Sequence, residues 1–274
     1  MLDRQLVSLE FARYVTLCAG AWLVVQSAAV VDDELWFELC YLDEAGSECR
    51  EPPALWAGLR PEGFHPVREF RWARGQGHLP GLWWSATTGV HVGHESWLER
   101  DHVMLLDFDP RVTAIAAQPF WLRWRDDAGR SRRHAPDLFA RLADGSGVVI
   151  DVRPDDRIER KDAEAFDATR KACGLAGWGF RRVGVPDPVL VANVAWLARY
   201  RHPRCGSPDL AGLLLEGFTE PVPLMAGAAA VGDPIAVLPA LFHLMWRHAL
   251  VADLAVRMTA DTLVVAGTAC GGAR

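Results

Sequence analysis

Lysine is almost missing from this sequence. Of 29 basic residues only Lys161 and Lys171 are lysine, and 35 acidic residues give the 274-residue chain a formal net charge of −6 at pH 7. That balance excludes a protein that coats DNA through bulk positive charge. A local basic groove remains compatible with it, because individual side chains make the contacts to phosphate.

Paired cysteines and a secretory leader are missing too. No two of the six cysteines form a Cys-x-x-Cys pair, and none has the spacing of a zinc site. This pattern is typical of free thiols in a reducing cytoplasm. Asp3 and Glu10 stand where a secretory leader carries positive charge, so we expect no leader.

The sequence also has few candidates for a membrane span. Residues 14–31 carry no charge, but their polar residues and the scarcity of Leu and Ile favour a strand. An aspartate and two prolines interrupt the apolar stretch 224–246. We therefore expect a soluble cytoplasmic protein that makes no contact with membranes.

The chain divides into three predicted blocks, residues 1–85, 86–205 and 206–274. The first block is β-rich, with strand-like runs at 21–31 and 34–43 that a hairpin turn joins. The Gly- and Pro-rich stretch 74–84 indicates a linker or an irregular coat. This block contains no motif that points to chemistry.

The central block alternates helical and strand-like patterns, which predicts an α/β unit. Asp144-Gly145 is suited to a hairpin turn, and Gly177 is placed to end a helix. The expected helices are 95–108, 159–177 and 188–200, and the expected strands are 112–118, 120–125, 134–142, 147–153 and 179–185.

The last block has a different outline. A helix is expected at 207–218, with Ser207 as its N-cap and Pro208 at its first position, and a second helix at 233–250. Two short strands are expected within 251–267. Two helices followed by a strand pair predict a winged helix.

Carboxylates flank the hairpin of the central block. Asp137 opens one strand and Asp151 lies near the end of the next, two residues before Arg153. Carboxylates on adjacent strands are suitable ligands for Mg²⁺, which polarises a phosphodiester and activates water. Residues two apart on a strand point to the same side, so Arg153 enters the same pocket as Asp151.

A third acid is available on the preceding helix. Glu95 and Glu99 are four residues apart, so both can lie on one helical face, and either can face the site. The alternative interpretation is that these acids are solvated groups on a surface hairpin, which is common for charged residues next to turns.

A wider pattern resembles the TnsA-like endonuclease subunit of heteromeric transposases. The resemblance runs from about residue 75 to 200, through TGVHVGHESWLERD, LLDFDPRVTAIAAQPF, HAPDLF, VVIDVRP and ANVAWLARY. It implies an α/β fold of the PD-(D/E)xK type, with a restriction-endonuclease-like central mixed sheet and flanking helices. The carboxy-terminal helices fit the small winged-helix domain of that family.

The resemblance also implies roles for individual residues. Glu99 and Asp137 would hold Mg²⁺, or Mn²⁺ in its place, and Asp151 would help to hold the metal or its water. Arg153 stands where the family has lysine. Arginine stays protonated in proteins, so it can stabilise developing charge but cannot act as a base.

An arginine-rich hairpin precedes Asp137. Its arginines outnumber Asp126 and Asp127, so we interpret it as the best candidate for contacts to the DNA backbone, with a solvated turn as the alternative. The candidate DNA-binding residues are Arg123, Arg125, Arg130, Arg132 and Arg133.

The sequence therefore predicts a Mg²⁺-dependent endonuclease subunit that cuts the 5′, non-transferred strand at transposon ends. The family resemblance implies double-stranded DNA, a DDE-type transposase and an AAA+ ATPase regulator as partners, in a bacterial cytoplasm at the nucleoid. The alternatives are an inactive scaffold that bridges transposase and regulator, another PD-(D/E)xK repair or restriction nuclease, and a transcription regulator that uses the winged helix.

Overall fold

The computed structural model describes residues 36–68 and 80–267. The strand predicted at 21–31 and its hairpin turn lie outside these residues. The described chain forms two compact units that divide between Pro186 and Asp187. Each unit has its own core and is described by itself.

A mixed four-stranded sheet lies at the centre of the first unit, in the order β10-β9-β8-β5. Strand β8 pairs antiparallel with both β5 and β9, whereas β10 runs parallel to β9 because helix α3 connects those two strands. The bounds are β5 (Val112–Ala117), β8 (Leu138–Leu142), β9 (Gly147–Val152), α3 (Arg160–Ala176) and β10 (Gly179–Val183). The elements predicted for this part of the chain are confirmed to within a few residues.

Local signals fix the ends of these elements. Gly145 has a φ of 86° in the turn between β8 and β9, where Asp144 Oδ1 accepts a hydrogen bond from the Ser146 amide at 2.9 Å. Helix α3 ends at Gly177, whose φ of 69° is left-handed, as predicted. The turn places the ends of β8 and β9 side by side.

A second four-stranded sheet packs on the same unit, in the order β2-β1-β6-β7. Phe37 and Leu39 of β1 share a core with Leu122 of β6 and with helix α3. The bounds are β1 (Phe37–Leu42), β2 (Glu48–Glu51), β6 (Trp121–Arg125) and β7 (Ser131–His134). Because β1 pairs with β6, the predicted boundary at residue 85 falls inside one compact unit.

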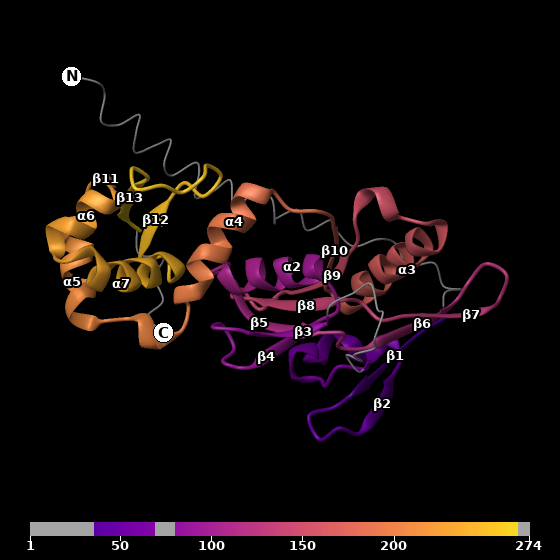
Figure 1. Ribbon diagram of the computed structural model, residues 1–274. Coiled ribbons are helices and arrows are strands. Elements are labelled where there is room, and N and C mark those ends of the chain that lie inside the picture. Colours follow the sequence, from indigo (N-terminus) through magenta and orange to yellow (C-terminus); the bar gives the residue numbers. More distant parts are fainter. Residues whose placement is uncertain (1–35, 69–79, 268–274) are drawn as a thin grey trace. The chain divides into compact units, whose positions relative to one another are not determined.

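Helix α2 (Trp97–Phe108) lies along the central sheet (Figure 1) and buries Val103, Met104 and Leu106. A two-stranded hairpin, β3 (Gly81–Trp84) and β4 (His91–His94), contacts this helix. The prediction of a linker or irregular coat over 74–84 was therefore wrong for its last four residues. Buried Asp107 explains the difference, because it accepts hydrogen bonds from Trp83 Nε1, Ser85 Oγ and the Thr87 amide and so fixes the hairpin.

The second unit contains four helices and a small antiparallel sheet in the order β11-β13-β12. Helix α6 and strand β11 were not expected from the sequence. Asn193 of α4 holds the connection between β12 and β13 by donating to the backbone oxygens of Leu254 and Val256. The bounds are α4 (Pro188–Leu197), α5 (Pro208–Gly217), β11 (Val222–Pro223), α6 (Leu224–Val231), α7 (Pro234–Trp246), β12 (Leu250–Ala252) and β13 (Leu263–Ala266).

Within the described ranges, no single helix is long and apolar enough to cross a membrane. Helices α6 and α7 reach that length and apolar composition only when they are taken together, and a bend of 119° separates them.

Two glycines of this unit give opposite expectations for an added methyl group. A Cβ at Gly227 would overlap the ring of buried Phe218, so Gly227→Ala should destabilise the unit by about 1–3 kcal/mol. Gly212 on α5 has open space around its Cβ position, and Gly212→Ala should stabilise it by about 0.5–1 kcal/mol. Hydrogen exchange of the α6 and α7 amides measures both changes in stability. Equal protection in the two variants would contradict the packing of Gly227 against Phe218.

Candidate active site

Asp137 and Asp151 come together where β8 begins and β9 ends. Leu138 pairs with Ile150, so the two aspartates occupy the next positions of the same ladder. Phe139 and Val149, each two residues away, point into the core that contains α3. Because strand side chains alternate, both aspartates point toward that side of the sheet.

The carboxyl group of Asp137 has a strongly perturbed environment. Its Oδ2 accepts a hydrogen bond from the Val152 amide at 2.7 Å. Burial raises the pKa of Asp137 well above its usual value, and the negative charges of Asp151 and Glu99 raise it further. These electrostatic effects show that the three predicted acids are neighbours.

Glu99 occupies the third position of helix α2. Its Oε2 accepts a hydrogen bond from the Glu95 amide at 2.7 Å, and its own amide donates to the N-cap oxygen, Ser96 Oγ, at 3.1 Å. This arrangement resembles a capping box. Burial is the main cause that raises the pKa of Glu99. The carboxylate therefore has a structural partner in addition to its place near Asp137.

Glu95 precedes α2, so it does not share a helical face with Glu99 as the sequence spacing predicted, and it is engaged elsewhere. Both Glu95 oxygens accept hydrogen bonds from Arg68 Nη2, at 2.6 and 2.5 Å. Glu99, the acid that the family resemblance selects, has no arginine hydrogen-bonded to its carboxylate among the described residues.

Asp151 is the most deeply buried of the acids, with 1% of its surface exposed. Its Oδ1 lies 2.8 Å from His134 Nε2, at the end of β7. Its Oδ2 is buried and has no hydrogen-bond partner within the described part of the chain. A buried carboxylate oxygen without a partner is costly, and such atoms often mark sites that bind an ion or water.

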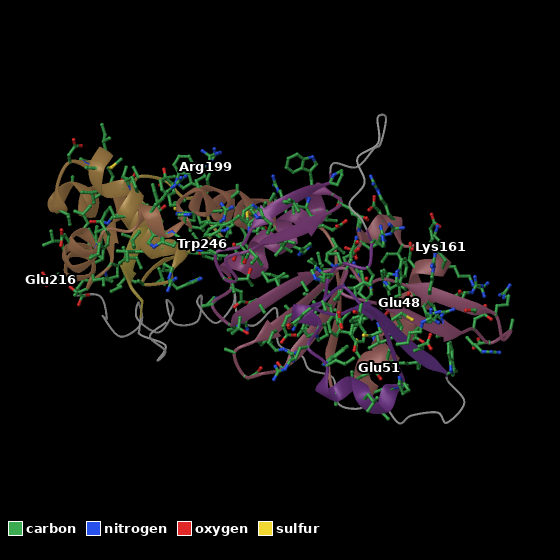
Figure 2. The ribbon with its side chains drawn as sticks, turned by 90° about the horizontal axis from the view of Figure 1, so that it is seen from below. Glu48, Glu51, Lys161, Arg199, Glu216 and Trp246 are labelled. Carbon is green, nitrogen blue, oxygen red and sulfur yellow. The ribbon has the colours of Figure 1, made fainter. Side chains whose placement is uncertain are left out.

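Arg153 does not join the carboxylates. Its Nη2 and Nε donate to Asp162 Oδ2 at 2.9 and 3.2 Å, on the first turn of α3. Lys161, labelled in Figure 2, pairs with Glu159 at 2.9 Å and is largely exposed. Neither cation is hydrogen-bonded to the carboxylate cluster.

The arginine-rich hairpin is only partly available for an anion. Arg130 and Arg132 both pair with Asp126. The hydrogen bond from the Arg130 amide is the main cause that lowers the pKa of Asp126 to about 2, and the two arginine side chains lower it further. Arg123 pairs with Glu38. The Cζ atom of Arg133 lies 4.6 Å from the ring centroid of Trp121, and that of Arg125 lies 6.0 Å from the ring centroid of Trp36. Neither arginine pairs with a carboxylate among the described residues.

A groove lies on the outer face of the sheet β2-β1-β6-β7, which we call the arginine-rich sheet. Its volume is about 400 Å³, and it is lined by Arg50, Arg123, Arg133 and Trp121 among others. Arg50 was missed from the sequence because it lies far from the hairpin along the chain. Cys40 of β1 pairs with Arg50 of β2 on one side and with Trp121 of β6 on the other, so β1 holds β2 and β6 in one sheet.

Gln118 is a further unusual residue beside Asp137. It has a φ of 45°, a left-handed conformation that is uncommon for residues other than glycine, and its amide donates to the Asp137 backbone oxygen at 2.9 Å. Its side chain is buried, and neither polar atom has a partner within the described residues. Sequence reasoning has no signal for a backbone conformation of this kind.

The acids can supply oxygen ligands, but they are not converged on one point. Across the described residues, no group of three or more His, Cys, Asp or Glu side chains is already arranged to hold a metal ion. Both Glu99 oxygens accept local hydrogen bonds, Oε2 from the Glu95 amide and Oε1 from Ser96 Oγ, whereas Asp137 accepts one at Oδ2. The orphaned Oδ2 of Asp151 and the mutual repulsion at Asp137 both fit a hard cation.

Comparison with known proteins supports a nuclease. Residues 109–183 match the family model described as TnsA-like endonuclease N terminal, which covers a little over a quarter of the chain. This segment is therefore similar to the amino-terminal domain of a TnsA-like endonuclease and includes Asp137, Asp151 and Arg153, whereas Glu99 precedes it. No curated protein matches the chain at the threshold applied.

The raised pKa of Asp137 has a consequence for stability. A carboxyl group whose pKa is higher in the folded state favours folding fully at low pH, and that contribution is lost as pH rises through its folded-state pKa. Asp137→Asn removes the charge and keeps an oxygen for the Val152 amide. In metal-free protein it should raise the unfolding midpoint at pH 7, and the gain should shrink toward pH 4.

Urea unfolding of wild type and Asp137→Asn across this pH range provides the measurement. Asp144→Asn is a matched control at an exposed turn, where the hydrogen bond from Ser146 Oγ chiefly lowers the pKa. That variant should lose stability above pH 4. A gain for Asp137→Asn that does not change with pH would contradict the environment described for Asp137.

Proposed function

We propose that this protein is a metal-dependent DNA endonuclease subunit of a heteromeric transposase, which cleaves the 5′, non-transferred strand at transposon ends. The observation that carries the proposal is the cluster of Glu99, Asp137 and Asp151, with its repulsive charges, two members of which lie in the segment similar to a TnsA-like endonuclease. Clustered buried carboxylates destabilise a fold, so their presence favours a functional role.

Glu99, Asp137 and Asp151 would hold Mg²⁺, or Mn²⁺ in its place. When bound, the cation would polarise the phosphate and lower the pKa of a water molecule. For this, Glu99 would have to release the Glu95 amide from Oε2 or the Ser96 hydroxyl from Oε1. Asp137 could offer Oδ1 and Asp151 Oδ2 without breaking a hydrogen bond that the described residues make. Neutralisation of the repulsion at Asp137 would offset the cost of these changes.

Arg153 would act on developing negative charge. Its guanidinium stays protonated, so it stabilises charge on the phosphate but does not remove a proton from water. Its guanidinium is bound to Asp162, and it would have to leave this partner to reach phosphate. The same ion pair favours the second candidate function, an inactive nuclease-fold scaffold that bridges transposase and regulator.

The topology supports the finer fold proposals. A helix, three antiparallel strands, a crossover helix and a parallel fourth strand follow in the order α2, β5, β8, β9, α3, β10, as in a PD-(D/E)xK core. In the second unit, the order α5, β11, α6, α7, β12, β13 with β13 central is the order of a winged helix. We propose that this domain docks the AAA+ ATPase regulator, while a DDE-type transposase cuts the 3′ strand of the same nucleoid DNA.

Strand-specific cleavage of a labelled transposon-end duplex tests the proposal, with the partner transposase and Mg²⁺ or Mn²⁺ present. Wild type should nick the 5′ strand, and EDTA or Asp137→Ala should reduce nicking by at least a hundredfold, because the cation loses a ligand. Arg153→Lys restores the family residue and should retain or increase nicking.

The remaining outcomes separate the two candidate functions. Nicking by Arg153→Lys but not by wild type would identify a scaffold that a single residue has inactivated. If neither protein nicks the duplex in the complete assembly, the endonuclease proposal is rejected. Lys161→Ala serves as the control, because that side chain pairs with Glu159 away from the cluster, and it should cut like wild type.

The groove on the arginine-rich sheet provides a test of DNA contact. Arg133→Ala should weaken binding to duplex DNA and make the plot of log affinity against log salt shallower by about 0.9, because one phosphate contact is lost. Arg130→Ala, on the same hairpin, removes a cation that Asp126 already neutralises and should change the slope less. Fluorescence anisotropy over a KCl series measures both, and equal slopes for the two variants would argue against the groove.

A further inference from the structure

His134 makes the one side-chain hydrogen bond to Asp151 in the described part of the chain. Its Nε2 lies 2.8 Å from Asp151 Oδ1. An ionised carboxylate only accepts hydrogen bonds, so the contact corresponds to the tautomer that carries hydrogen on Nε2. The imidazole also packs edge-on against Phe166 of α3, with ring centroids 6.5 Å apart and planes at 76°. The ring is thus held on two sides.

This contact joins the two sheets of the first unit. His134 ends β7 of the arginine-rich sheet and pairs with Leu122, whereas Asp151 belongs to β9 of the central sheet. Two residues lie between His134 and Asp137, and β8 begins immediately after Asp137, at Leu138. The segment that crosses between the sheets therefore carries one member of the carboxylate cluster and the partner of another.

The hydrogen bond distinguishes the two oxygens of Asp151. A free carboxylate can exchange its oxygens by rotation about its terminal torsion angle, which is a broad, two-fold torsion. Here Oδ1 is occupied by His134, so Oδ2 is the oxygen without a partner, and it is buried.

We propose that His134 is a positioning residue for the cation site, which orients Asp151 so that Oδ2 is the ligand oxygen. The inference rests on the proposed function. Residues that orient metal ligands through hydrogen bonds commonly change metal affinity or activity 10- to 100-fold when they are replaced. Arg153 and Lys161 are not available for this role, because they are bound to Asp162 and Glu159.

Binding of Mn²⁺ to the full-length protein, followed by the electron paramagnetic resonance signal of free Mn²⁺, tests this role without relying on cleavage. His134→Ala should weaken Mn²⁺ binding about 10- to 100-fold. His134→Gln places an amide donor at a similar distance and should restore most of the affinity. His134→Asn has the same amide on a shorter side chain and should behave like His134→Ala.

The Gln and Asn variants keep the test informative if alanine prevents folding, because they differ by one methylene group. His65→Ala is the control for loss of a histidine, since His65 is exposed and contacts the Glu44 backbone oxygen. It should bind Mn²⁺ like wild type. In the cleavage reaction, His134→Ala should lower kcat and leave the KM for DNA unchanged, because the proposed role acts through Asp151.

The outcomes separate the inference from the function on which it rests. If wild type binds Mn²⁺ and His134→Ala and His134→Asn bind it equally well, the positioning role is wrong and the endonuclease proposal stands. If wild type binds no Mn²⁺ and cuts no DNA, the endonuclease proposal fails and the inference fails with it. Weakened binding in the Ala and Asn variants, with recovery in the Gln variant, supports the role.

Discussion

Repulsion between carboxylates is the constraint on which the rest of the candidate site depends. Asp137 and Asp151 are held on adjacent strands with Glu99 near them, where burial reduces the screening by water. The protein meets this repulsion with local hydrogen bonds. The Val152 amide, the Glu95 amide and His134 each satisfy one carboxylate. Asp151 Oδ2 is buried and has no hydrogen-bond partner among the residues that the structure describes.

The central α/β elements were predictable because their signals are local. The turn at Asp144-Gly145, the stop at Gly177 and the alternation of apolar residues are each contained in a few neighbouring positions, and the structure confirms them. The three acids were also predicted from sequence, through spacing and a family resemblance, and their role as metal ligands stays a prediction. Spacing alone left Glu95 and Glu99 open, and the family resemblance selected Glu99. The ion pair of Glu95 with Arg68 could not be predicted, because Arg68 lies 27 residues away.

Features that depend on distant partners could not be predicted. Strands β1 and β2 were assigned to a separate block because no local pattern shows that β1 pairs with β6. The irregular interpretation of 81–84 failed because buried Asp107, which fixes this hairpin, lies more than twenty residues further along the chain. The partners of His134 and Arg153 were missed for the same reason. The sequence around a single histidine or arginine in a strand does not indicate which residue it contacts.

The ion pair between Arg153 and Asp162 links the chemistry of position 153 to the start of a helix. Asp162 Oδ2 accepts from the Glu159 amide at 3.0 Å and from both donors of Arg153, so one carboxylate caps α3 and holds the arginine. A substitution at position 153 therefore also changes how α3 begins, and a substitution at Asp162 frees the guanidinium. The two positions are expected to evolve as an epistatic pair, so that lysine returns at 153 most readily when residue 162 changes with it.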